Sequence, residues 1–210
     1  TAQALLAIIS ASYAIYHGPE RLKNIANNIH HHTRYLKKSL ENLGFEIISK
    51  NYFDTLLIKT SKAKYWVNKS IEQGINFRLV DDKNFTLSLD ETTTLKEVDN
   101  LLVFFNEEKI DIFPEQIENT IDKSCFENSL SRDDKILNHP VFNSYHSETE
   151  MMRYLKKLEN KDIALNRSMI PLGSCTMKLN AASEMLPITL PGFSNAHPFL
   201  QPHQRHGYNQ

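Results

Sequence analysis

Apolar residues follow helical spacing through the first 43 positions of the chain. Residues 1–16 are nearly all apolar or small, which predicts a helix buried on most sides, and Gly18 and Pro19 break it. A second helix is predicted to begin at Pro19, because proline suits a first helical position, and to end at Gly44. The apolar stripe of this helix comprises Leu22, Ile25, Ile29, Leu36, Leu40 and Leu43.

The next segment alternates between the strand period and the helix period. The pattern predicts strands at 45–49 and 54–60, a helix at 61–74, strands at 76–80 and 85–89, and a helix at 92–106. Residues 81–84 are polar and predict a hairpin turn between the last two strands. We therefore expect an α+β domain over about residues 1–108, with helices layered on a mostly antiparallel sheet.

Regular patterning weakens after residue 108. Prolines and polar residues interrupt residues 109–166, which we interpret as a connector. Within it, Ser147 and Glu150 have the spacing of a capping box and predict a helix at about 148–160. Prolines recur through residues 167–210, which predicts a tail that is largely extended or looped.

Composition excludes several classes of protein. The chain has 210 residues with 24 basic and 25 acidic side chains, so a strong electrostatic attraction for nucleic acid or an anionic membrane is not expected. The apolar run at residues 4–9 is too short to span a bilayer. Cys125 and Cys175 have no C-x-x-C spacing, which favours a reducing compartment. The absence of an initiating methionine suggests a piece of a longer protein.

The histidines and one arginine invite functional interpretations that the pattern does not favour. His30, His31 and His32 are adjacent on a predicted helix, so their side chains diverge by about 100° and cannot converge on one ion. His197, His203 and His206 lack a carboxylate or thiol at ligand spacing, so no metal site is expected. Arg78 could bind a carboxylate or phosphate, although an ion pair at the sheet edge is favoured.

The sequence RSMIPLGSCTMKLN at residues 167–180 carries the strongest chemical signal. Gly173 permits a close backbone approach, and Ser174, Cys175 and Thr176 offer short hydrogen-bonding groups. Lys178 could form a Schiff base with an aldehyde cofactor, but no phosphate-binding loop is recognisable beside it. Nucleophilic catalysis by Cys175 would need an activating base, which the pattern does not supply.

The same stretch, preceded by VFNSYHSETEMMRYLKKLENKDIAL at 141–165, closely resembles the P-protein family of the glycine cleavage system, glycine dehydrogenase (decarboxylating). The segments TAQALLA, AIYHGPERL, INFRLVDD and SLDETTT resemble that family in the same order. The resemblance implies two related halves of the aspartate aminotransferase type, which is fold type I of the pyridoxal phosphate (PLP) enzymes. Residues 1–108 would be the small C-terminal domain of the first half, 109–166 the bridge, and 167–210 the start of the second, PLP-bearing half.

The resemblance also implies a function for the longer protein. PLP would bind glycine, the carboxylate would leave as CO2, and the aminomethyl group would pass to the lipoyl group of the H-protein. The family's Schiff-base lysine lies in a histidine-lysine motif that these residues lack, so Lys178 is not that lysine, and the chain alone is expected to bind no PLP and to be inactive. Gly173, Ser174, Cys175 and Thr176 would lie near cofactor or substrate.

Partners and location follow from the same resemblance. We expect glycine, the H-protein and the remaining domains of the same polypeptide as partners, a homo-oligomeric parent, and neither nucleic acid nor membrane. A bacterial cytoplasm is favoured, or the mitochondrial matrix for a eukaryotic source. The alternative is a structural and interaction module that mediates assembly of the two halves without catalysing a reaction.

Overall fold

A computed structural model describes residues 4–111, 117, 121, 132, 134–161, 183, 186–197 and 199–208. The chain divides into two compact units, Thr1–Lys156 and Lys157–Gln210. All strands of the described residues lie in the first unit, where they form a four-stranded sheet.

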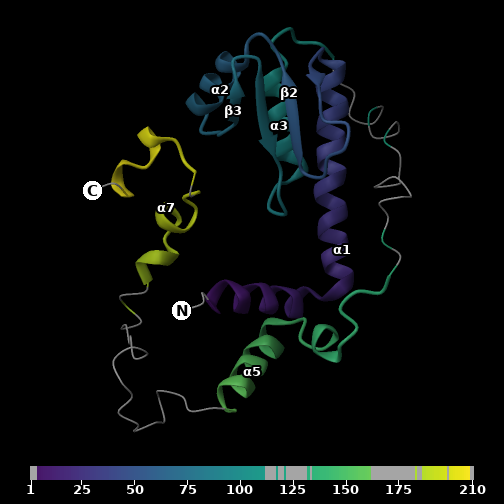
Figure 1. Cartoon of the computed structure of the whole chain (residues 1–210), viewed down its shortest axis with the longest axis vertical. Coiled ribbons are helices and arrows are strands. Elements are labelled where there is room, and N and C mark those ends of the chain that lie inside the picture. The colour runs from purple at the N-terminus through teal and green to yellow at the C-terminus, as the bar shows by residue number, and fades with distance from the viewer. Residues whose placement is uncertain are drawn as a thin grey trace. The chain divides into compact units, whose positions relative to one another are not determined.

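Helix α1, Ala4–Asn42, bends sharply near its middle (Figure 1). Gly18 has φ 66° and ψ 176°, so the backbone leaves the helical conformation there, and Pro19 begins the helix again. The predicted break is therefore confirmed. We call residues 4–17 the first arm, residues 17–19 the elbow and residues 19–42 the second arm.

The second arm is amphipathic and packs as the sequence predicts. Tyr35 is 1% exposed, and Leu36 and Leu40 are fully buried. The arm ends at Gly44, whose φ of 87° lets its N–H donate to the carbonyl of Glu41 while the N–H of Phe45 donates to Leu40. These two bonds satisfy carbonyl groups that the helix end would otherwise leave unpaired.

The prediction that the first helix is buried on most sides is wrong for this chain. Leu5 and Leu6 are 65% and 69% exposed, and every residue from 4 to 11 is exposed. An apolar pattern shows that a helix can be buried, but burial also requires a covering element. No described residue supplies that cover.

The sheet is fully antiparallel in its pairings, as predicted. It comprises β1 (Glu46–Ile47), β2 (Thr55–Lys59), β3 (Arg78–Asp81) and β4 (Asn84–Ser88), in the order β1-β2-β4-β3. β4 is antiparallel to both β2 and β3, so these two strands run parallel to each other on either side of it. The hairpin predicted at residues 81–84 joins β3 to β4.

The helices cover one face of this sheet. α2 (Ala63–Glu72) contacts β3 and β4, whereas α1 contacts β1, β2 and α3 (Leu95–Phe105), which lies behind the strands in Figure 1. Between helices and sheet lies an aromatic cluster in which each ring lies within about 6 Å of a neighbouring ring. The cluster contains Phe45, Trp66, Phe77, Phe85, Phe104 and Phe105.

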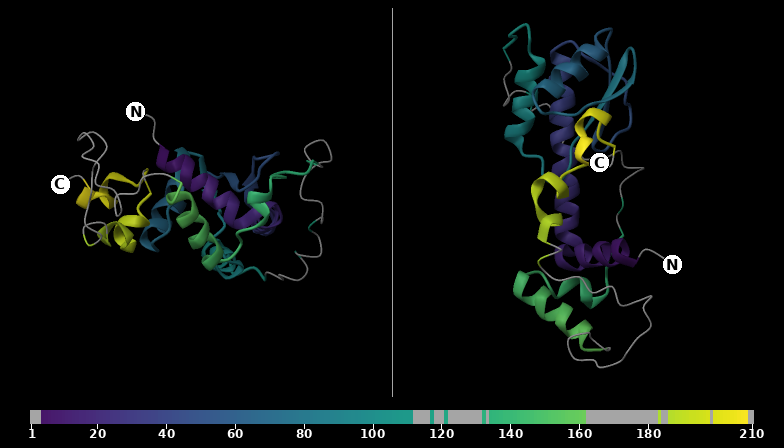
Figure 2. Two further views of the ribbon diagram at one scale, coloured as in Figure 1. Left: turned by 90° about the horizontal axis from the view of Figure 1, so that it is seen from below. Right: turned by 90° about the vertical axis from the view of Figure 1, so that its left-hand side faces the viewer.

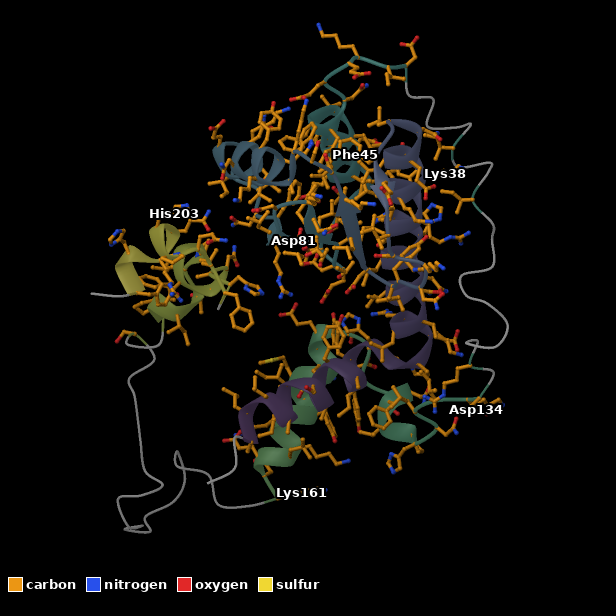
Figure 3. All side chains as sticks on the ribbon, turned by 45° about the horizontal axis from the view of Figure 1, so that its top comes forward. Lys38, Phe45, Asp81, Asp134, Lys161 and His203 are labelled. Atoms are coloured by element: carbon orange, nitrogen blue, oxygen red, sulfur yellow. The ribbon has the colours of Figure 1, made fainter. Side chains whose placement is uncertain are left out.

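Figure 3 shows Phe45 among these packed side chains and Lys38 on the outer side of α1. The burial of Trp66 and Val67 confirms the predicted inner side of α2. Arg78 alternates with buried Phe77 and is exposed on the opposite face of the sheet, across from Thr86.

Two further helices of the connector lie within the described residues. A 3-10 helix, η2, spans Pro140–Asn143, and α5 spans Glu148–Glu159, close to the predicted 148–160. The Ser147 hydroxyl accepts a hydrogen bond from the Glu150 N–H at 3.3 Å and donates to the Glu150 carboxylate at 3.0 Å. The Ser147 half of the predicted capping box is therefore confirmed, whereas the Glu150 carboxylate accepts from the Ser147 hydroxyl and not from a backbone N–H.

The second unit is more helical than the proline pattern predicts. Its described residues form α7 (Pro191–Ser194) and the 3-10 helices η4 (Leu186–Thr189), η5 (Pro202–Gln204) and η6 (His206–Tyr208). Pro191 and Pro202 stand at the first position of their turns, where a fixed φ favours helix and no N–H is needed. The prolines therefore begin short helices here.

Candidate functional site

The predicted site residues Gly173, Ser174, Cys175 and Thr176 lie outside the described residues, as do Lys178 and Cys125. Their proximity to a cofactor stays a prediction. The other stretches that carry the family resemblance are largely described, and three of them, AIYHGPERL, VFNSYHSETE and SLDETTT, lie at two places in the first unit. These are the elbow of α1 and the loop that joins β4 to α3.

The elbow requires glycine for two independent reasons. Gly18 is buried and has a positive φ, which residues with a side chain rarely adopt. A Cβ atom at this position would also lie 2.5 Å from Cε1 of His146 and 2.7 Å from the carbonyl oxygen of Phe142. The bend of α1 therefore depends on a close approach that only glycine allows.

A segment far along the chain holds the elbow. We call residues 139–147 the strap, and Figure 2 shows it beside the bend of α1. His146 Nδ1 lies 2.9 Å from the carbonyl oxygen of Tyr16, and Arg21 Nη1 donates to the carbonyl of His146 at 3.3 Å. Because a carbonyl only accepts, the Nδ1 of His146 carries the proton, which leaves Nε2 as an acceptor in the neutral ring.

The strap is itself ordered by local contacts. His139 Nδ1 accepts from the N–H of Val141, and Pro140 begins η2. Within the strap, the ring of Tyr145 stacks on the ring of Tyr154 of α5 with centroids 4.2 Å apart, which joins the strap to that helix. The stretches AIYHGPERL and VFNSYHSETE, separated by more than 100 residues, therefore form one structural unit at the elbow.

The second place is the loop of residues 90–94, within SLDETTT. Asp90 Oδ1 accepts hydrogen bonds from the N–H of Thr92 at 2.9 Å, from the Thr92 hydroxyl at 2.7 Å and from the N–H of Thr93 at 3.1 Å. The hydrogen bond from the Thr92 hydroxyl is the largest of the effects that lower the pKa of Asp90. These hydrogen bonds hold the backbone of the loop in a turn around the Asp90 carboxylate.

This loop ends in a capping box that sequence reasoning missed. The Thr94 hydroxyl accepts from the Glu97 N–H, and the Glu97 carboxylate accepts from the Thr94 N–H at 2.7 Å. The latter bond is the main cause of the lowered pKa of Glu97. The spacing T-x-x-E before an apolar run is the signal that could have revealed it.

The loop of residues 90–94 touches both arms of α1. The pKa of Tyr13, on the first arm, is raised by burial and then by the charge of Glu91, to which its hydroxyl donates. The pKa of His32, on the second arm, is lowered by burial and by His31, although a hydrogen bond to the Thr93 backbone opposes the shift. Residues of the loop therefore influence the pKa of one side chain on each arm.

The histidines do not form a metal centre among the described residues. His30 is 4% exposed and its Nδ1 lies 2.9 Å from the Phe53 carbonyl oxygen, whereas His31 is exposed. His197, His203 and His206 are exposed in the second unit. Across the described ranges, no three His, Cys, Asp or Glu side chains gather closely enough to hold a metal ion.

A shallow pocket of about 240 Å³ lies where the ends of α1 and α3 meet the turn before α2. Its floor is aromatic, with Phe45, Trp66 and Phe105, and its rim carries both lysines and glutamates. Because the rim carries charges of both signs, the pocket favours neither an anionic nor a cationic ligand. In the part of the chain that the structure describes, this pocket contains no nucleophile-base pair.

Within the described residues, no helix is long and apolar enough to cross a membrane. The elbow and the loop of residues 90–94 both lie in the part of the chain that matches a family model. That model, described as "Glycine cleavage system P-protein", matches residues 1–105.

Curated relatives match the chain from end to end. A glycine dehydrogenase (decarboxylating) from Pelagibacter ubique is 47% identical over 213 residues, and one from Photobacterium profundum is 48% identical. Each alignment covers 100% of this chain and 22% of the relative. A relative from Schizosaccharomyces pombe, whose name adds the word mitochondrial, is 46% identical over 222 residues.

The chain therefore spans about 22% of the length of these relatives. The two places described above combine stretches that the family resemblance predicted with contacts that only the fold reveals. Together with the family match over residues 1–105, they lead to one conclusion. The chain belongs to the glycine cleavage system P-protein family.

Proposed function

We propose that this chain is part of an enzyme that decarboxylates glycine and transfers the remaining aminomethyl group to the lipoyl group of an H-protein. The observation that carries the proposal is the 47% identity, over the whole chain, to a protein named glycine dehydrogenase (decarboxylating). The family match over residues 1–105 agrees with it.

The proposal includes a domain assignment. Residues 1–108 form the small C-terminal domain of a first half of PLP fold type I, residues 109–166 form the bridge, and residues 167–210 begin the second, PLP-bearing half. An antiparallel sheet with helices on one face is compatible with this assignment. The large cofactor-binding domains lie outside these 210 residues.

We assign a role in binding to Gly173, Ser174, Cys175 and Thr176. Two hydroxyl groups, a thiol and an uncrowded backbone form a donor set that fits the carboxylate of glycine or the phosphate of PLP. Bound PLP supplies an electron sink for the carbanion left when CO2 departs. Ser174 and Thr176 orient the substrate carboxylate by hydrogen bonding, and Gly173 lets the backbone approach it.

The partners follow from the same assignment. Glycine is the substrate, the lipoyl carrier H-protein accepts the aminomethyl group, and the parent polypeptide is a homo-oligomer. Lys178 does not anchor the cofactor, because the family's anchoring lysine belongs to a motif that these residues lack. The cytoplasm of a bacterium, or the matrix of a mitochondrion, is the proposed location.

The decisive experiment uses the full-length protein. Ser174→Ala combined with Thr176→Ala should lower glycine-dependent CO2 exchange by about 10²-fold, since each lost donor loosens the orientation of the substrate carboxylate. The matched control is Thr189→Ala with Ser194→Ala, two hydroxyls of the same tail whose bonds are local. An unchanged exchange rate in the first double variant would remove residues 174 and 176 from the site.

The isolated 210-residue chain provides a second test. Incubated with PLP and then reduced with borohydride, it should carry no covalent cofactor on any lysine, and it should not exchange CO2 with glycine in the presence of a lipoyl carrier. A stable adduct on Lys178 would refute the assignment of the anchoring lysine to another part of the enzyme.

A second candidate function is assembly. The exposed apolar first arm of α1 favours an interaction module whose surface meets the missing domains. The isolated chain should therefore associate weakly with itself as its concentration rises, and Leu6→Glu should reduce this association. Light scattering that gives a monomer mass at every concentration would contradict this function.

A further inference from the structure

The first arm of α1 exposes mostly apolar side chains and no charged carboxylate, ammonium or guanidinium group. Leu5, Leu6, Ile8 and Ile9 are 65%, 69%, 58% and 53% exposed, and residues 4–17 contain no Asp, Glu, Lys or Arg. A helix that is apolar all round is normally enclosed by protein. Among the described residues, nothing covers residues 4–11.

The arm has two unlike sides. The helical spacing of about 100° per residue places Leu5, Leu6, Ile8 and Ile9 on one side, and Ala4, Ala7 and Ala11 on the other. The large side chains can insert into pockets, and the alanine side lets a neighbouring backbone approach closely. Both sides lack charge, so the cover must reach the arm from more than one direction.

The arm is also held in a defined direction. Ile15, near the elbow, is 8% exposed, and the Tyr16 carbonyl is bonded to His146. A surface that is already fixed loses little conformational entropy when its partner binds. The arm is therefore prepared for docking before the covering surface arrives.

The length of the relatives decides between the possible occupants. A second copy that pairs through the same surface covers one side of each arm and leaves the other in water. The curated relatives, in contrast, hold nearly four-fifths of their sequence outside the region that this chain matches, because the chain spans 22% of them. The family match includes the arm, since it covers residues 1–105.

We propose that residues 4–13 dock into an uncharged, apolar groove that the same polypeptide supplies outside these 210 residues. The inference rests on the proposed membership in a longer enzyme and names the partner of the assembly surface. The groove encloses both sides of the arm. The part of the polypeptide that forms the groove is thereby held in a fixed position relative to the elbow and the strap.

The test compares cysteine reactivity in two contexts. Ile9→Cys probes the large side and Ala11→Cys the small side, with maleimide labelling measured on the corresponding peptide, so that Cys125 and Cys175 need no replacement. Each variant is labelled in the dilute 210-residue chain and in the full-length protein. Both cysteines should react at least about tenfold more slowly in the full-length protein.

Lys38→Cys is the matched control, because Lys38 is an exposed residue of the same helix in the charged second arm. Its labelling rate should be similar in the two contexts. Equal rates for Ile9→Cys in both contexts would overturn the proposal. Protection of Ile9→Cys alone, with Ala11→Cys still reactive, would indicate one-sided cover such as a second copy.

A measurement on the wild type removes the dependence on variant folding. Hydroxyl-radical footprinting of residues 4–13 should show strong oxidation in the dilute 210-residue chain and protection in the full-length protein. Equal oxidation of residues 4–13 in the dilute chain and in the full-length protein would overturn the proposal. The CO2 exchange assay is independent of these readouts, so failure of the catalytic assignment and failure of the docking proposal are distinguishable.

Discussion

The two arms of α1 belong to one helix but differ in how far their apolar side chains are buried. The second arm mixes charged and apolar residues, and its Leu36 and Leu40 are fully buried. The first arm carries no charged side chain, yet Leu6 is 69% exposed. Burial is therefore decided by the availability of a covering surface, and the more apolar arm is the one left without it. Full burial of a large apolar side chain contributes about 1.5–3 kcal/mol to the free energy of unfolding, and in this chain the exposed side chains of the first arm do not make that contribution.

The largest expected effect separates the arms directly. Leu40→Ala should lower the free energy of unfolding by about 2–5 kcal/mol, because it opens a cavity in the core. Leu6→Ala should change it by less than about 0.5 kcal/mol, since the side chain contacts little in this chain. Urea denaturation of the two variants provides the measurement. Equal losses would mean that the first arm is buried in solution.

The elbow between the arms gives the next effect. Gly18→Ala should cost about 2–4 kcal/mol, because the positive φ is strained and the new Cβ meets His146 and Phe142. Gly44→Ala has a similar φ but no atom within 4 Å of its Cβ, so it should cost only about 1 kcal/mol. Thermal unfolding followed by circular dichroism compares them. A smaller loss for Gly18→Ala would refute the close approach of the strap.

The cap of α3 gives a moderate effect. Thr94→Ala removes the hydroxyl that accepts from the Glu97 N–H and should cost about 1 kcal/mol. Thr94→Ser keeps that oxygen and should restore most of the stability. Chemical denaturation of both variants is the measurement, and a serine variant as unstable as the alanine variant would argue against capping.

The smallest effect concerns pH. The pKa of Asp90 is lowered in the folded chain, first by the Thr92 hydroxyl, so its contribution to stability is present above the ordinary carboxylate pKa. That contribution is lost as the pH falls through the lowered pKa. The difference in unfolding free energy between wild type and Asp90→Asn should therefore shrink below about pH 4. A difference that does not change with pH would exclude this linkage.

The sequence predicts the elements of the first unit well, because each depends on local spacing. The break at Gly18, the inward side of α2 and the capping of α5 by Ser147 are all local signals, and the structure confirms them. The exposure of the first arm is not local, since it depends on what lies above the helix. The approach of His146 to the elbow depends on folding across more than 100 residues.

The candidate site divides in the same way. The family resemblance singles out HGP and SLDETTT, and the structure gives them local roles at the elbow and in the loop of residues 90–94. The influence of the loop on the pKa of Tyr13 and of His32, one on each arm of α1, could not be predicted from spacing. The roles of Gly173, Ser174, Cys175 and Thr176 lie outside the described residues and await the experiments above.

The position of β4 between β2 and β3 bears on how the chain is synthesised. β2 leaves the ribosome before β4, and its own hairpin partner, β1, is only two residues long. Until residues 84–88 emerge, the edge of β2 that will face β4 has no strand to pair with. A nascent chain arrested before Ser88 should consequently expose an aggregation-prone strand, and the whole sheet should form in a single late step.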